Sequence, residues 1–191
     1  MKPTSIALAA MAAGALLAAQ AADAQTLERN AALATTSDGV GGFNAYFGDT
    51  FAASTAGRDF TDVFTFSVPT PFDAAASLTA LYLDSPQTKH LDIVGLNLVR
   101  YDPASSAILG NAISGIDQTG FGQFPTDAWS LSAFDLPAGS YALRIDGRVS
   151  EVAGGVFGAD LAIAAVPEAQ AWRMLAAGLG VLGTLAWRRR R

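Results

Sequence analysis

The stretch Ser140-Tyr141-Ala142-Leu143-Arg144-Ile145-Asp146-Gly147-Arg148-Val149-Ser150 decides the fold class of this chain. The apolar residues that we predict on one face of a strand are Tyr141, Leu143, Ile145 and Val149. The polar residues that we predict on the other face are Arg144, Asp146, Arg148 and Ser150. A period of two indicates a half-buried strand, and antiparallel sheets with one solvated face produce it.

Other segments repeat this alternation and are separated by turn residues. The predicted strands are residues 43–51, 59–68, 77–83, 91–101 and 156–165. The groups of residues expected to share a face are Leu78, Ala80 and Tyr82; Val94, Leu96 and Leu98; and Phe157, Leu161 and Ile163. No strong helical period occurs between residues 43 and 165. We therefore predict an all-β domain over residues 43–165, an antiparallel β-sandwich of jelly-roll-like kind, preceded by a flexible lead-in or weak strand at residues 25–42.

The N-terminal residues have the composition of a secretory signal peptide. Lys2 precedes an apolar run at residues 6–19, and Ala22-Asp23-Ala24 has the small-x-small pattern of a signal-peptidase site. We expect residues 1–24 to be removed, with Ala22 and Ala24 as the recognised positions and Gln25 as the mature start.

The last 26 residues combine a short motif, an apolar stretch and a basic end. Val166-Pro167-Glu168-Ala169 precedes a predicted transmembrane helix at residues 171–187. At 1.5 Å per residue, this helix would reach about 25 Å, against roughly 30 Å of hydrocarbon. The residues expected to hold this end in the cytoplasm are Arg188, Arg189, Arg190 and Arg191.

This tail resembles the PEP-CTERM sorting tail of exported bacterial proteins. The resemblance rests on Val166, Pro167 and Glu168, on the glycines of the apolar stretch and on the terminal arginines. The stretch Phe60-Thr61-Asp62-Val63-Phe64 fits the pattern that names the FxDxF type, through Phe60, Asp62 and Phe64. Residues 136–143 and the glycine-rich residues up to Val166 resemble the closing part of those proteins.

The resemblance implies a Gram-negative bacterium that exports the chain through Sec and signal peptidase. It also implies transient anchoring in the inner membrane, cleavage by an exosortase, release to the cell surface or the outside, and a link to exopolysaccharide and biofilm. The usual motif is Pro-Glu-Pro, whereas this chain has Ala169 at the third position. Since proline there would fix an extended backbone, Ala169 leaves the recognition geometry less constrained.

Charge and composition exclude several classes of function. Residues 25–165 contain 6 Lys and Arg against 15 Asp and Glu, so their net charge is −9. A domain this acidic is repelled by nucleic acid. The chain has no cysteine, which excludes disulfides, thiol chemistry and cysteine-ligated metals.

Asp62 is the internal residue whose position needs an explanation. In a regular strand it shares a face with Phe60, Phe64 and Phe66, which is the face expected to be buried. A buried carboxylate needs partners. The partners that we consider are Arg58, Arg144 and Arg148, or the backbone N–H groups of a bulge. The alternatives are a Ca²⁺ site of Asp62 with Asp59 or Asp49 as helper, and a surface position.

Other candidate residues carry weaker signals. We expect solvated loop positions for Asp84, Asp92, Asp102, Asp117 and Asp127. His90 is the only histidine, and we expect a surface position that supports neither a zinc site nor a catalytic triad. The aromatic residues that could line a sugar-binding face, although packing is the simpler explanation, are Tyr46, Tyr82, Tyr101 and Trp129.

The sequence as a whole predicts an exported, exosortase-processed surface or matrix protein without enzymatic activity or a required cofactor. Exopolysaccharide is an expected partner. The alternatives are a secreted Ca²⁺- or carbohydrate-binding module, a secreted hydrolase, and an uncut single-pass inner-membrane protein.

Overall fold

A computed structural model describes residues 26–81, 90–120, 126–150 and 154–166, with residues 177 and 179. The strands are β1 (Leu27–Ala32), β2 (Thr35–Ser37), β3 (Phe43–Thr50), β4 (Asp59–Val68), β5 (Phe72–Leu81), β6 (Leu91–Asp102), β7 (Ala107–Ser114), β8 (Ile116–Asp117), β9 (Ala128–Leu136), β10 (Gly139–Val149) and β11 (Val156–Ala165). A short 3₁₀-helix, Ala53–Thr55, follows β3. The part of the chain that the structure describes contains no helix that is both long enough and apolar enough to span a membrane.

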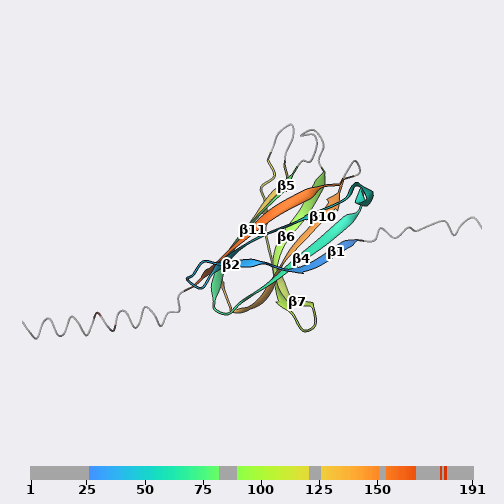
Figure 1. Cartoon of the computed structure of the whole chain (residues 1–191). Coiled ribbons are helices and arrows are strands. Elements are labelled where there is room, and N and C mark those ends of the chain that lie inside the picture. The colour runs from blue at the N-terminus through green and yellow to red at the C-terminus, as the bar shows by residue number, and fades with distance from the viewer. Residues whose placement is uncertain are drawn as a thin grey trace, which may run out of the picture.

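The strands form two sheets that pack face to face (Figure 1). Sheet A has the order β1-β4-β10-β6-β7, and sheet B has the order β2-β3-β11-β5-β9-β8. β1 runs parallel to β4, while the other paired strands are antiparallel. The all-β, two-sheet prediction is therefore confirmed, and jelly-roll connectivity stays a prediction.

The core lies between the sheets and is rich in aromatic rings. Phe60 and Phe157 stack across the interface with ring centroids 6.1 Å apart, and Phe51 packs on Phe60 at 4.3 Å. Leu143 and Ile145 of β10 are fully buried beside β4. Complete burial of such side chains contributes roughly 1.5–3 kcal/mol each, so packing holds this cysteine-free domain together.

Two predicted strands, 59–68 and 156–165, coincide with β4 and β11. The face predicted for Val94, Leu96 and Leu98 is wrong at Val94, which is 62% exposed while both leucines are buried. A register shift between β10 and β6 at Asp146 and Gly147 explains the error. A bulge adds one residue to a strand and reverses the side chains that precede it.

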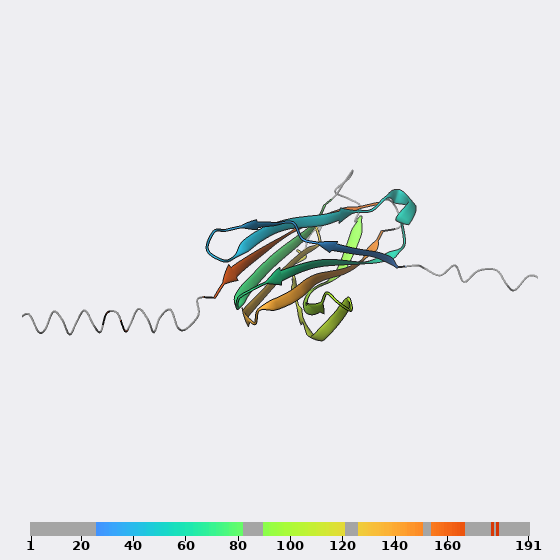
Figure 2. The ribbon, with the colours of Figure 1, turned by 60° about the horizontal axis from the view of Figure 1, so that its bottom comes forward.

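The segment predicted as a lead-in or weak strand contains β1 and β2. β1 pairs with β4 in sheet A, and β2 pairs with β3 in sheet B. Residues 26–42 therefore connect the two layers on one side of the sandwich. On the opposite side of sheet A, β7 extends beyond the layers (Figure 2).

Candidate functional site

The sorting tail begins where the last strand of sheet B ends. β11 ends at Ala165, and the N–H of Val166 donates to the carbonyl of Pro71 at 2.9 Å. The predicted motif residues Pro167 and Glu168, the helix at 171–187 and Arg188–Arg191 lie outside the continuously described residues, as do Ala22 and Ala24. The described domain thus closes immediately before the motif.

The FxDxF residues lie on the inner face of β4. Phe60, Asp62 and Phe64 are all buried, which confirms the predicted alternation. Asp62 is 1% exposed, and its register neighbours are Arg29 on β1 and Ile145 on β10. The motif therefore contributes two rings and one carboxyl group to the core.

Asp62 is paired differently from the prediction. Its carboxyl group lies within hydrogen-bond distance of Asp49, and Arg29 is the nearby cation. Arg144 and Arg148 instead form ion pairs with Asp146 at 2.9 Å and Asp59 at 3.4 Å. Sequence reasoning missed Arg29 because β1 pairs with β4 across a long separation in the chain, which no local period reveals.

Burial and a second carboxylate change the acidity of Asp62. Burial is the largest cause, and the charge and hydrogen bond of Asp49 add to it, while Arg29 opposes both; together they raise the pKa of Asp62 from 3.8 to about 7. A neutral Asp62 is thus the dominant form below neutrality.

The residues proposed for a Ca²⁺ site are only partly brought together. Asp49 and Asp62 are adjacent, but Asp59 points to the outer face of sheet A, toward Arg148. Among the described residues, no group of three or more His, Cys, Asp or Glu side chains is placed to hold a metal ion. Arg29 also lies 2.6 Å from Asp49, where a bound cation would have to sit.

Two residues predicted at the surface are buried. Asp127 is 3% exposed; its Oδ2 accepts from the N–H of Ile93 at 2.8 Å and its Oδ1 accepts from the hydroxyl of Thr119 at 3.5 Å. His90 is 4% exposed, and its Nδ1 donates to the carbonyl of Gly154 at 2.8 Å. Backbone groups that are 34 and 64 residues away in the sequence meet the two side chains, so their local sequence does not indicate their burial.

The outer face of sheet A carries open polar hollows. One, of about 380 Å³, lies at Asp59, Asp92 and Arg148, and another, of about 230 Å³, lies at Asn97 and Arg144 beside β7. Asp146 borders both hollows; Arg144 binds it through two nitrogens, and Thr61 donates to it at 2.8 Å. This face offers donors and acceptors side by side, which is a suitable arrangement for binding hydroxyl groups.

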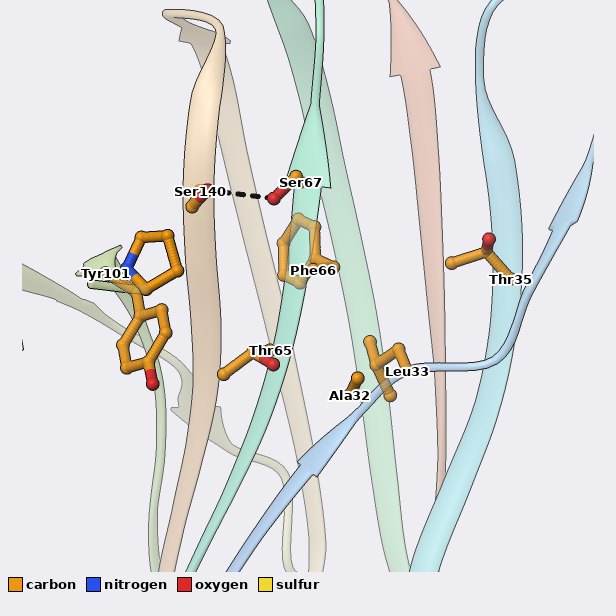
Figure 3. Close-up of a pocket in the computed structure, with 9 residues that line it drawn as sticks. Ala32, Leu33, Thr35, Thr65, Phe66, Ser67, Tyr101 and Ser140 are labelled. Atoms are coloured by element: carbon orange, nitrogen blue, oxygen red, sulfur yellow. Dashed lines mark hydrogen bonds between the residues drawn. The ribbon is translucent and has the colours of Figure 1, made fainter. Parts of the chain in front are cut away.

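A third hollow, of about 300 Å³, lies near the other end of this face (Figure 3). The hydroxyl groups of Ser67 and Ser140 are 2.8 Å apart, and Tyr101 lies beside them. Figure 3 also shows the chain leaving β1 through Leu33 and crossing toward Thr35. Of the predicted aromatic set, Tyr101 thus borders a hollow, whereas Tyr46 is 82% exposed on sheet B.

Several solved structures resemble this chain at low sequence identity, including a lysozyme inhibitor and a collagenase domain. PliG of Aeromonas hydrophila, a periplasmic inhibitor of g-type lysozyme, is 9% identical to this chain. The TM-score is 0.35, and the match covers 72% of this chain and 99% of that one. The pre-peptidase C-terminal domain of a Bacillus anthracis collagenase is 14% identical, with a TM-score of 0.34 over 71% of this chain and 95% of that one. No curated protein matches the sequence significantly.

The C-terminal residues give a direct match. Residues 165–191 match the family model described as the PEP-CTERM protein-sorting motif. This range begins at the last residue of β11, so the motif follows the folded domain without overlapping its other strands. The chain therefore carries a PEP-CTERM protein-sorting motif at residues 165–191, which implies export and an exosortase as the processing partner.

Proposed function

We propose that this chain is an exported surface or extracellular-matrix protein whose tail is removed by an exosortase. The observation that carries the proposal is the shared boundary at Ala165, where β11 ends and the sorting motif begins. Cleavage beyond Val166 breaks none of the described strands, so the sandwich can be released intact. Export through Sec and signal peptidase, with the inner membrane as a transient anchor, precedes this step.

The released domain serves as a non-enzymatic matrix component. Its only histidine is buried and donates to a backbone carbonyl, which removes it from contact with a substrate. Asp49 and Asp62 are the carboxyl pair that resembles an acid–base couple, but Asp62 is buried and Arg29 binds Asp49. A substrate therefore has no access to the perturbed carboxyl group.

Mass spectrometry of the secreted fraction tests the sorting proposal. We expect a mature form that starts at Gln25 and lacks Arg188–Arg191. Replacing Glu168→Ala removes a motif side chain and is expected to leave the chain in the membrane fraction, whereas Ala169→Pro restores the usual motif and is expected to be processed at least as well. A secreted parent chain that still carries the four arginines contradicts the proposal, and an uncut chain in carbonate-washed membranes favours a single-pass membrane protein.

A second candidate function is binding of exopolysaccharide on the outer face of sheet A. The observation in its favour is the row of polar hollows that runs from Arg148 past Arg144 and Asp146 to Tyr101. Paired donors and acceptors match sugar hydroxyl groups, and a tyrosine ring can stack on a sugar ring.

Calorimetry with polysaccharide from the exporting strain tests this second function. Tyr101→Ala is expected to weaken binding, while Tyr46→Ala, which removes an exposed tyrosine from sheet B, is the matched control and is expected to bind like the parent. Equal binding by both variants counts against this face. A titration with Ca²⁺, before and after EDTA, tests whether a cation contributes.

A further inference from the structure

Arg29 closes the side of the sandwich where β1 of sheet A faces β3 of sheet B. Its Nη1 lies 2.6 Å from Oδ1 of Asp49 and donates to the carbonyl of Gly48 at 3.2 Å. Its guanidinium carbon lies 5.8 Å from the ring centroid of Phe64. One side chain of an edge strand thus connects the two layers.

Asp62 lies behind this closure, with few polar neighbours. Its Oδ2 is buried and has no hydrogen-bond partner among the described groups. Phe60 and Phe64 flank it on the inner face of β4, and Ile145 is its register neighbour on β10. The charged groups that face it are Asp49 from β3 and Arg29 from β1. The charged groups of β10 that form ion pairs on the outer face of sheet A instead are Arg144, Asp146 and Arg148.

We propose that Asp49 and Asp62 share one proton beneath Arg29, and that this proton is a pH-sensitive latch that holds β1 against the side of the sandwich. Asp49 is the ionised partner, because it forms the ion pair with Arg29. Asp62 carries the proton, because a neutral carboxyl group can donate to Asp49 and tolerates an apolar environment better than a carboxylate does.

Loss of the proton places two carboxylates against one guanidinium. The pKa of Asp62 is about 7 in the folded chain, against 3.8 for an ordinary aspartate. The folded state therefore binds the proton more tightly than an open state does. The stability of the latch is complete below pH 4, falls as pH rises toward 7, and stays constant above that value.

β1 is the element that moves most readily to hydrate an ionised Asp62. It is a six-residue edge strand in which the side chains of Leu27 and Ala31 are only partly buried and the other four are exposed. Edge strands with few buried contacts open most easily, because their local unfolding exposes little apolar surface. Displacement of β1 admits water to Asp62 and uncovers the backbone edge of β4.

Hydrogen–deuterium exchange of the full-length chain in detergent tests the latch between pH 5 and pH 8. After correction for the intrinsic exchange rate, we expect the protection of residues 27–32 to fall by up to about tenfold per pH unit up to about pH 7 and then to level off. Asp62→Asn, which stays neutral, is expected to abolish this dependence. Asp59→Asn, on the outer face of the same strand, is the matched control and is expected to behave like the parent.

Two further variants keep the test decisive if Asp62→Asn does not fold. Asp49→Asn removes a group that raises the pKa of Asp62, so the transition is expected at lower pH. Arg29→Gln removes the group that lowers this pKa, so the transition is expected at higher pH. Shifts in these opposite directions support the latch. Protection of β1 that does not change with pH in the parent, or the same pH dependence in Asp62→Asn, overturns it.

Discussion

Asp62 and Asp127 are both buried aspartates, yet their surroundings differ in kind. Asp127 accepts hydrogen bonds from a backbone N–H of β6 and from Thr119, while its own carbonyl accepts from Ala80 of β5. Asp62 faces a second carboxyl group, and its Oδ2 has no partner among the described groups. Asp127 thus connects the two sheets through satisfied hydrogen bonds, whereas Asp62 depends on a proton.

The difference shows that burial alone does not define the role of an aspartate. A buried carboxylate that receives donors stabilises the fold, because those donors would otherwise be unsatisfied. A buried carboxyl group beside another carboxylate introduces a dependence on pH. His90 belongs with Asp127, since its ring donates to the carbonyl of Gly154.

The largest effect is expected for Asp127→Ala. The buried N–H of Ile93 loses its acceptor, which costs about 2–3 kcal/mol of the free energy of unfolding. Asp127→Asn keeps a side-chain carbonyl and is expected to lose less. Urea unfolding of both variants checks this. A loss below about 0.5 kcal/mol for Asp127→Ala would show that the hydrogen bonds of Asp127 do not stabilise the fold, which contradicts the contrast drawn with Asp62.

Asp62→Asn is expected to raise the free energy of unfolding at alkaline pH, whereas Asp127→Ala lowers it. At pH 8 the parent holds a buried charge that the variant lacks, so the variant is expected to be more stable by about 1–2 kcal/mol. The gain should shrink as pH falls toward 5, because the parent then binds its proton. Urea unfolding at four pH values measures this, and a constant difference would show that ionisation of Asp62 is not its source.

A smaller effect is expected for His90→Gln, which removes the donor at the Nδ1 position. The carbonyl of Gly154 loses its partner, and the free energy of unfolding is expected to fall by about 1 kcal/mol. His90→Asn places an amide nitrogen near the original Nδ1 and serves as the control. Equal stability of the two variants in thermal unfolding would mean that this hydrogen bond contributes little.

The smallest effect is expected for Asp59→Asn. Asp59 and Arg148 form an ion pair at 3.4 Å with both side chains more than half exposed. Exposed pairs contribute little, so a change below about 0.5 kcal/mol is expected at pH 7. A larger loss in urea unfolding would indicate that this ion pair on the outer face of sheet A stabilises the fold.

The sequence predicts the parts of the structure that follow local periods. Alternation over residues 59–68 predicted β4 and placed Asp62 among buried phenylalanines. Asp49 was predicted beside Asp62 only as a helper in a Ca²⁺ site, and Arg29 was not predicted as a partner. Both residues come from strands of different sheets that meet Asp62 only through tertiary pairing. The bulge beside Val94 was missed because it breaks the period on which the prediction depended.

Polar residues in loops were the least predictable. Asp127 and His90 have polar or turn-forming neighbours, a context in which solvent exposure is the usual outcome. Once buried, both side chains meet backbone partners from distant parts of the chain, which are the carbonyl of Gly154 for His90 and the N–H of Ile93 for Asp127. The sorting motif, in contrast, was predicted from the sequence because it is a linear signal.

The most direct test of the sorting account is the C-terminus of the chain in a strain with and without its exosortase. The account predicts that the parent strain releases a chain that ends before Arg188, whereas the deletion strain keeps Arg188–Arg191 on a membrane-bound chain. The same C-terminus and the same location in both strains would contradict it.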